Sequence, residues 1–132
     1  MEPTWVYLVE DDPAIAGMYR IGLEMHGFRV SVATSGDELF SSLAGRGPEI
    51  FVLDYQLPGA NGAEVLEQIR GDDRTSAAMV FMLSNFPQWH DGAIDRVIAQ
   101  GAIAWFEKAK TPPGMLGAKL TEALDARTRR DG

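Results

Sequence analysis

The chain contains no cysteine, which excludes a disulfide framework and any zinc site built from thiolates. No apolar run approaches the ~20 residues that a membrane-spanning helix needs. Residues 1–4 show no basic stretch leading into an apolar segment, so we expect no secretory signal. Positive charge is scarce, because 12 Lys and Arg face 19 Asp and Glu and the net charge is −7. These absences predict a cytoplasmic protein that neither inserts into a membrane nor binds nucleic acid directly through its phosphates.

The size and composition are those of an ordinary globular protein. A length of 132 residues and an apolar fraction of 45% predict one domain over residues 1–132, with its core over about residues 4–128. The basic residues Arg127, Arg129 and Arg130 form one cluster near the C-terminus. Its simplest interpretation is a solvated helix end, where cations interact favourably with the helix dipole.

Five short apolar segments alternate with amphipathic ones and are predicted strands. They are Val6–Glu10, Arg29–Ala33, Ile50–Asp54, Val80–Ser84 and Ala102–Phe106. The first, third and fourth are apolar without alternation, which is typical of strands buried on both faces of a parallel sheet. The second alternates, with Val30 and Val32 on one side, and this favours an edge strand with one face partly wet.

Local signals mark the helices between these strands. Asp12 followed by Pro13 predicts an N-cap and a proline at the first helical position, and Gly27 predicts the end of the same helix. The apolar stripe of this helix comprises Ile15, Met18 and Gly22. Capping-box spacing marks the starts of the second and third helices. A fourth helix is predicted from Ile94, Val97 and Ile98 and ends near Gly101. A fifth begins at Thr111-Pro112. The two capping boxes are Ser35 with Glu38 and Asn61 with Glu64.

Strand and helix alternate five times, which predicts an α/β fold with a parallel sheet covered on both faces. Sites in such folds lie beyond the carboxyl ends of the strands. The polar groups at these ends are Glu10–Asp12, Asp54, Ser84–Asn85 and Glu107–Lys108. Clustered carboxylates repel one another unless cations offset them, and a lysine with a hard divalent ion such as Mg²⁺ would do so.

Each group also has a purely structural interpretation. Glu10–Asp12 could simply cap the first helix, and Asp54 could be a turn aspartate. Ser84 could be a loop hydroxyl and Lys108 a surface cation. The combination, in this order and at these strand ends, is what favours a functional site for phosphate chemistry.

Four segments in this order resemble the receiver domain of two-component response regulators. Leu8–Pro13 resembles the first strand of that family with its acidic residues, and Val52–Gly62 resembles the phosphoacceptor strand and the following loop. Leu83–Ser84 matches the hydroxyl position, and Phe106–Lys108 matches the strand end that carries the family's lysine. The resemblance covers essentially the whole chain. It implies a five-stranded parallel sheet in the order 2-1-3-4-5, flanked by five helices in a flavodoxin-like three-layer sandwich.

The resemblance also implies a role for each matching residue. Asp54 would be the phosphoacceptor that attacks a phosphohistidine, with Lys108 and Ser84 contacting the transferred group. Lys108 would pair with Asp54 in the resting state. Mg²⁺ (or Mn²⁺) would be bound directly by Asp11 and Asp54, by the backbone carbonyl of Gln56, and by Glu10 through water.

The same resemblance implies a switch and two kinds of partner. Ser84 and Trp105 would be the switch residues, acting on the face formed by the fourth helix, fifth strand and fifth helix. The partners would be a sensor histidine kinase or phosphotransfer protein and a downstream effector protein or domain. The chain would not be a turnover enzyme. It shows no helix-turn-helix or catalytic domain, so we expect a stand-alone receiver or a piece of a larger regulator or hybrid kinase.

Two departures from the family pattern stand out. Lys108 is followed by Ala109 where the family commonly has proline in a cis peptide, so we expect either a trans bond with a reshaped loop or a strained cis bond. Phe86 follows Ser84 by two positions and is expected to screen the phosphoryl group from water, which predicts slow loss of phosphate.

Three alternatives stay open at the level of sequence. One is a degenerate receiver that acts as a phosphate-independent interaction module. Another is a phosphoaspartate hydrolase, although Gln56 stands where such enzymes carry a second acid. The third is a flavin-binding protein, although no Ser/Thr/Gly-rich loop follows the first strand.

Overall fold

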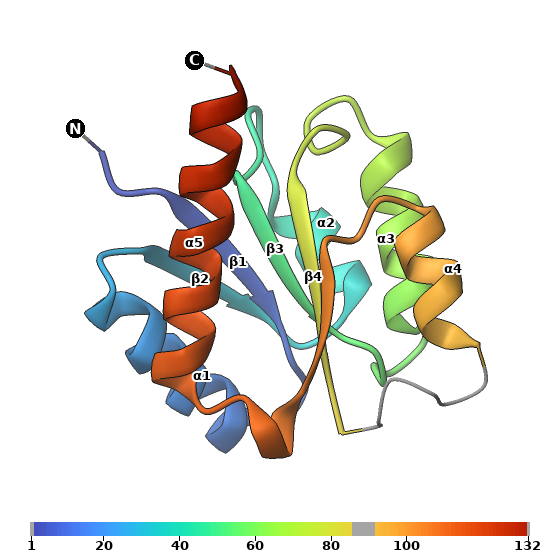
Figure 1. Ribbon diagram of the computed structural model, residues 1–132. Coiled ribbons are helices and arrows are strands. Elements are labelled where there is room, and N and C mark those ends of the chain that lie inside the picture. The colour runs from blue at the N-terminus through green and yellow to red at the C-terminus, as the bar shows by residue number, and fades with distance from the viewer. Residues whose placement is uncertain (1, 86–91, 132) are drawn as a thin grey trace.

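A computed structural model describes residues 2–85 and 92–131 of the chain. Figure 1 shows a central sheet with helices packed on both of its faces. The strands are β1 (Trp5–Val9), β2 (Arg29–Ala33), β3 (Ile50–Asp54), β4 (Met79–Ser84) and β5 (Ala104–Glu107). The helices are α1 (Pro13–Met25), α2 (Gly36–Ser42), α3 (Gly62–Gly71), α4 (Ala93–Ala99), the 3₁₀ turn η1 (Lys108–Lys110) and α5 (Pro113–Asp131).

All five strands are parallel, and their order in the sheet is β2-β1-β3-β4-β5. The predicted fold class and strand order are therefore confirmed. Every residue of β3 and β4 is buried, as expected for central strands whose two faces are both covered. β2 forms an edge of the sheet, as its sequence pattern predicts, and is only partly buried: Arg29 is exposed, while Val30 and Ala33 are buried.

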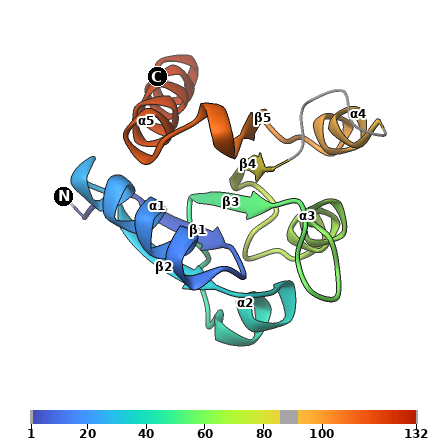
Figure 2. The ribbon, with the colours of Figure 1, turned by 90° about the horizontal axis from the view of Figure 1, so that it is seen from below.

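Two apolar cores lie on opposite faces of the sheet. One joins α1 and α5 to the sheet, and its largest fully buried side chain is that of Tyr19. The other joins α2, α3 and α4 to the sheet and contains Phe51 and Trp105. Figure 2 shows this layering, with the two groups of helices on either side of the strands. Among the described residues, no helix is long and apolar enough to cross a membrane.

The ends of the helices follow the local signals closely. Asp12 is the N-cap of α1, and its side chain accepts hydrogen bonds from the backbone N–H groups of Ala14 and Ile15. Gly27 has a φ of +86°, which is the left-handed conformation expected after the last turn of α1. The Asn61–Glu64 capping box at α3 is complete. At α2 only one half forms, because Glu38 accepts from Thr34 rather than from the backbone of Ser35.

Several predicted details were wrong. The apolar stripe of α1 does not all face the sheet, since Gly22 is buried but Met18 is 50% exposed. The buried positions of this helix are Ala16, Tyr19, Gly22 and Leu23. The reason is that α5 packs against α1 so closely that a Cβ at Gly22 would lie 2.3 Å from Pro113, and this contact sets the rotation of the helix.

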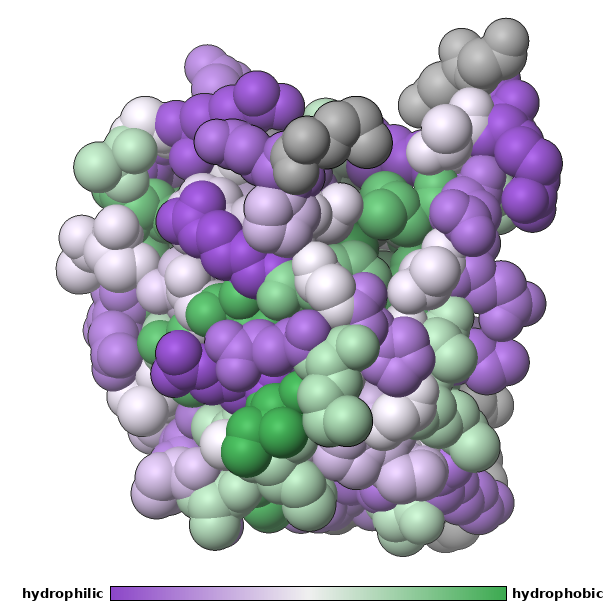
Figure 3. All heavy atoms as spheres, turned by 90° about the vertical axis from the view of Figure 1, so that its left-hand side faces the viewer, coloured by the Kyte–Doolittle hydropathy of each residue, from purple (hydrophilic) through white to green (hydrophobic). Residues whose placement is uncertain are grey.

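The surface of α1 therefore carries apolar side chains. Met18, Ile21 and Met25 are all at least half exposed. Figure 3 views the molecule from the left-hand side of Figure 1 and shows green apolar side chains interspersed with purple polar ones. At α4, Val97 is buried as expected, but Ile98 is 45% exposed. β5 begins two residues later than predicted, although the backbone N–H of Ile103 already donates to the carbonyl of Val80 on β4.

Candidate functional site

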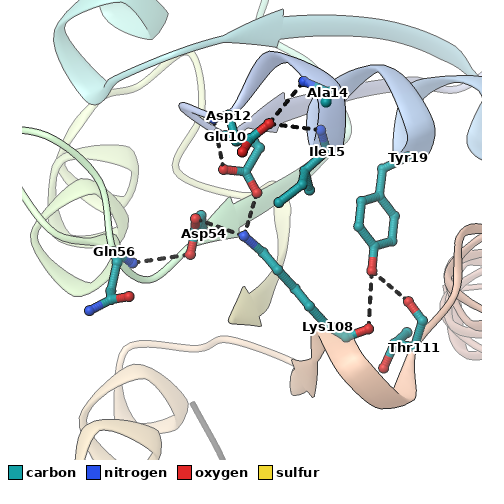
Figure 4. Close-up of polar contacts among 9 residues, drawn as sticks. All are labelled: Glu10, Asp12, Ala14, Ile15, Tyr19, Asp54, Gln56, Lys108 and Thr111. Carbon is teal, nitrogen blue, oxygen red and sulfur yellow. Dashed lines mark hydrogen bonds and ion pairs between the residues drawn. The ribbon is translucent and has the colours of Figure 1, made fainter. Parts of the chain in front are cut away.

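The carboxyl ends of four strands lie along one edge of the sheet. Asp54 is the last residue of β3 and Ser84 the last of β4, while Glu10 and Lys108 directly follow β1 and β5. Figure 2 looks onto this edge, and Figure 4 shows the side chains of Glu10, Asp54 and Lys108 meeting there. In parallel strands these ends must lie together, so the fold brings residues that are far apart in the sequence to one place.

Asp54 is 5% exposed, and both of its carboxylate oxygens have partners. Its Oδ1 accepts a hydrogen bond of 3.1 Å from the backbone N–H of Gln56, across the turn that follows β3. Its Oδ2 lies 2.9 Å from the Lys108 ammonium. A buried carboxylate is stable in its charged form only with such partners, and here they hold the side chain in one orientation.

Lys108 pairs with two carboxylates rather than with Asp54 alone. Its Nζ donates to Oε1 of Glu10 as well as to Oδ2 of Asp54. The three side chains are 9%, 3% and 7% exposed, so this is a buried ion-pair network. The other oxygen of Glu10, Oε2, accepts a hydrogen bond of 3.2 Å from the backbone N–H of Asp12. The pairing of Lys108 with Glu10 was not predicted, because only a contact through a metal-bound water was expected for Glu10.

The pKa values of this network reflect burial and charge together. Burial raises the pKa of Glu10, and the charge of Asp54 adds to this, while hydrogen bonds from Lys108 and the Asp12 backbone act against it. Burial by itself would lower the pKa of Lys108, but its hydrogen bonds to Glu10 and Asp54 outweigh this and raise it. Lys108 is therefore held firmly in its ammonium form at neutral pH.

Asp11 lies beside this network and is exposed to solvent. One carboxylate oxygen each from Glu10, Asp11 and Asp54 lies within 4.8 Å of the others. Oxygens that share one Mg²⁺ at about 2.1 Å lie at most about 4.2 Å apart, so small side-chain movements would complete such a set. The three carboxylates carry three negative charges, and the ammonium of Lys108 compensates one of them. A bound divalent cation would balance the two that remain. The donor set is all oxygen and fits a hard divalent metal.

Ser84 and Gln56 border the same cluster. Ser84 is fully buried and pairs in register with Glu107 of β5, one strand away from Asp54. The side chain of Gln56 is exposed, and its backbone lies against Asp54 through the hydrogen bond to Oδ1. The structure therefore brings Glu10, Asp54 and Lys108 into direct contact, with Asp11 beside them. The backbone of Gln56 is bonded to Asp54, and Ser84 lies at the end of the neighbouring strand β4.

Trp105 lies on the inner side of β5 and not on its surface. It is 2% exposed, and its ring lies 5.1 Å from that of Tyr55, centroid to centroid, with an angle of 45° between the planes. Although β5 is at an edge of the sheet, Trp105 is therefore a core residue and not a half-buried surface aromatic. Tyr55 directly follows Asp54, so Trp105 contacts a neighbour of the candidate phosphoacceptor. This contact had no signal in the sequence.

The loop after Lys108 takes the first of its two predicted forms. The described residues contain no cis peptide bond, so the Lys108–Ala109 bond is trans and the chain turns through η1. The hydroxyl of Tyr19 on α1 donates a hydrogen bond of 2.6 Å to the carbonyl of Thr111, at the end of this turn. Burial raises the pKa of Tyr19, so its hydroxyl remains a donor. No feature of the sequence predicts this contact. The predicted screening role of Phe86 lies outside the described residues.

Comparisons with known proteins agree on one family. The sequence-family model of the response regulator receiver domain matches residues 6–118 of this chain. The transcriptional regulatory protein TrcR of Mycobacterium tuberculosis is 34% identical over 72% of this chain and 35% of its own length. The phosphate regulon transcriptional regulatory protein PhoB of Rhizobium meliloti is 30% identical over 84% of this chain and 48% of its own length. The chain thus spans less than half the length of either relative.

Solved structures show the same fold. A CheY-like response regulator receiver domain protein from Methanospirillum hungatei superimposes with a TM-score of 0.83 at 23% identity, over 97% of this chain and 98% of the other. The BeF3-activated DrrB receiver domain superimposes with a TM-score of 0.80 at 21% identity, over 93% of this chain and 98% of the other. At these identities the likeness concerns the arrangement of strands and helices.

Proposed function

Since this chain belongs to the response regulator receiver domain family, we propose that it receives a phosphoryl group from a phosphohistidine on the carboxylate of Asp54. The observation that carries the proposal is the buried carboxylate of Asp54, held by the Gln56 N–H at 3.1 Å on one oxygen and by Lys108 at 2.9 Å on the other. An oriented carboxylate with an adjacent cation is what in-line phosphoryl transfer needs.

The metal of this site is proposed to be Mg²⁺, or Mn²⁺ in its place. Asp11 and Asp54 would bind it directly, with the backbone carbonyl of Gln56, and Glu10 through water. The support is the all-oxygen donor set at the carboxyl end of β1 and β3. When bound, the ion offsets the charge on the transferring phosphoryl oxygens.

The remaining steps belong to the side chains of the chain itself. A carboxylate oxygen of Asp54 forms the new bond to phosphorus as the bond from phosphorus to the histidine nitrogen breaks. Lys108 then exchanges its bond to Asp54 for one to a phosphoryl oxygen, while it keeps Glu10. Ser84 donates its hydroxyl to another phosphoryl oxygen. Little other chemistry is required, because transfer depends on position and charge.

The switch is proposed to run from Ser84 to Trp105 and to the face of α4, β5 and α5. Phosphorylation adds negative charge and acceptor oxygens beside Ser84, which favours the conformation in which its hydroxyl reaches them. The Tyr55–Trp105 contact supports a link, since Tyr55 follows the phosphoacceptor directly. A downstream effector protein or domain would read the altered face.

The finer assignments are also proposals. A sensor histidine kinase or phosphotransfer protein would supply the phosphoryl group, and the relatives' names as transcriptional regulators make a DNA-binding output the simplest effector. The chain would act as a phosphoacceptor, with no activity beyond its own phosphorylation and dephosphorylation. A cysteine-free composition supports a cytoplasmic location.

The test is phosphorylation by acetyl phosphate in the presence of Mg²⁺, followed by intact mass. We expect one added phosphate in the wild type. We expect the same in the control Asp125→Asn, which changes an exposed aspartate of α5 that is not part of the carboxylate cluster. We expect none in Asp54→Asn. A wild type that takes no phosphate would favour the degenerate receiver, and a phosphorylated Asp54→Asn would move the acceptor elsewhere.

A further inference from the structure

The turn that carries Lys108 has few contacts of its own. Within η1, Ala109 and Lys110 are exposed, and Thr111 is the first residue after Lys108 to be buried. The backbone N–H of Thr111 donates to the carbonyl of Lys108 at 3.2 Å, which closes the turn. A short 3₁₀ turn with one internal hydrogen bond is a weak structure unless something else holds it.

Tyr19 supplies that additional contact from another part of the chain. Its ring is 2% exposed, within the core between α1, α5 and the sheet. Its hydroxyl lies 2.6 Å from the carbonyl oxygen of Thr111 and 3.5 Å from that of Lys108. Figure 4 shows the ring pointing from α1 to the two carbonyls at the start and end of the turn. Because the ring is packed, the direction of the hydroxyl is set by the core and not by the turn.

We propose that Tyr19 is a positioning residue for phosphoryl transfer, and that it acts through Lys108. The hydroxyl fixes the turn from which the lysine side chain extends, so that its Nζ lies 2.9 Å from Oδ2 of Asp54. This inference rests on the proposed phosphoacceptor function. The Tyr19 hydroxyl contacts the carbonyls of Lys108 and Thr111, so its effect on Asp54 passes through the backbone of residues 108–111.

The physical basis is the flexibility of lysine. Four side-chain bonds rotate between the backbone of Lys108 and its ammonium, so the ammonium stays on Asp54 only if the backbone is held still. Each additional conformation of the turn reduces the fraction of molecules in which the lysine is in reach of a phosphoryl oxygen. A fixed turn also lets Lys108 change partners at Nζ without a movement of the backbone.

The test removes the hydroxyl and keeps the ring. Tyr19→Phe is expected to fold, because the ring that packs in the core is retained. A hydrogen bond of this kind shifts an equilibrium about fivefold, so we expect the rate of phosphorylation by acetyl phosphate with Mg²⁺ to fall about fivefold. The affinity for Mg²⁺ should not change, since Asp11 and Asp54 are untouched.

The chain offers a matched control in Tyr7. It is also buried, at 4% exposure, and its hydroxyl also makes a 2.6 Å hydrogen bond, but to Ser42 on the other side of the sheet. Tyr7→Phe should lower the thermal midpoint about as much as Tyr19→Phe and leave the phosphorylation rate unchanged. Equal loss of rate in both variants would mean that the effect is one of general stability and would overturn the proposal.

A double-mutant cycle separates action through Lys108 from an independent effect. In a Lys108→Met background, Tyr19→Phe should cause no further loss of rate, because the group that it positions is gone. If the rate losses of Tyr19→Phe and Lys108→Met instead multiplied in the double variant, the proposal would be overturned. So would a Tyr19→Phe rate equal to that of the wild type. Failure of the phosphoacceptor function itself would look different, because the wild type would then take no phosphate on Asp54.

Discussion

Lys108 and Arg70 are two cations largely withdrawn from solvent, and their partners differ in kind. Lys108 donates to two carboxylates, those of Glu10 and Asp54, at the carboxyl end of the sheet. Within the described part of the chain, Arg70 at the end of α3 donates only to backbone carbonyls. These are the carbonyls of Gln100 at 3.0 Å, Ser76 at 3.1 Å, Ala78 at 2.7 Å and Gly101 at 3.1 Å.

Because of this difference, Lys108 can exchange its hydrogen-bond partners, whereas Arg70 cannot. The guanidinium of Arg70 is a rigid fork, and its acceptors are uncharged and fixed by the backbone. Burial lowers its pKa, yet arginine stays charged. Arg70 therefore ties the end of α3 to the loops before β4 and after α4. An ammonium with freely rotating donors, as in Lys108, can exchange a carboxylate for a phosphoryl oxygen when charge is added nearby.

Removal of the Lys108 ammonium should have the largest effect. Lys108→Met keeps most of the unbranched side chain but leaves the transferring phosphoryl group without its cation, so we expect phosphorylation by acetyl phosphate to slow about 100-fold or more. The measurement is intact mass against time. Lys119→Met, which removes an exposed lysine of α5, should react at the wild-type rate. A Lys108→Met rate within a factor of about three would contradict the role of the ammonium.

Arg70→Met should have the opposite profile. Two of the carbonyls that lose their donor, those of Gln100 and Ala78, are partly buried, so we expect a loss of about 2 kcal/mol in the free energy of unfolding, measured in urea. The phosphorylation rate should stay within about twofold, because distant sites act independently. Arg20→Met is the control, since Arg20 is exposed and its ion pair with Glu24 contributes about 0.5 kcal/mol or less. Equal losses in the two variants would remove the distinction drawn for Arg70.

Magnesium should stabilise the folded protein through the carboxylate cluster beside Lys108 and not through the region around Arg70. At ten times its dissociation constant, the ion should raise the free energy of unfolding by about 1.4 kcal/mol, and EDTA should reverse this. Asp11→Asn should lose most of the increment, because it removes a carboxylate of the cluster. Arg70→Met should keep all of it. Thermal melts with and without Mg²⁺ give the comparison, and an increment that survives in Asp11→Asn would place the ion elsewhere.

The smallest effect is a pH dependence that belongs to Lys108. Its pKa in the folded protein is raised above the ordinary value of 10.5, so its contribution to stability is complete below that value. The contribution is lost as pH rises through the higher folded value. Urea unfolding of the wild type and Lys108→Met between about pH 9 and pH 12 should therefore show a difference that shrinks toward the alkaline end. A difference that does not change with pH would disprove the shift.

Signals confined to a few neighbouring residues predicted most of the fold. Asp12 and Pro13 open α1 as expected, and Asn61 with Glu64 opens α3. These contacts span at most three or four residues, so the sequence contains all that they depend on. The Ser35 capping box was only half right, because Thr34 competed for the Glu38 carboxylate. Burial of Met18 was wrong, because the packing of α5 decides which side of α1 faces inward.

The candidate site divides in the same way. The positions of Asp54, Ser84 and Lys108 at strand ends could be predicted, since buried strands stop where polar residues begin. The pairing of Lys108 with Glu10, across 98 residues, could not. Neither could the contact of Tyr19 with Thr111, across 92 residues, or the four carbonyls around Arg70. Neither the type of such a residue nor its neighbours in the sequence identify the distant group that it contacts in the folded protein.

The sequence by itself determined the order of strands and helices, their caps, and the reactive groups at the strand ends, because these depend on periodicity and on contacts within one or two turns. Only the tertiary structure decided which carboxylates share Lys108, which ring holds its turn, and where Trp105 points. Those outcomes depend on the angles and distances at which helices and strands pack. Packing is a property of the whole chain, so no local segment can specify it.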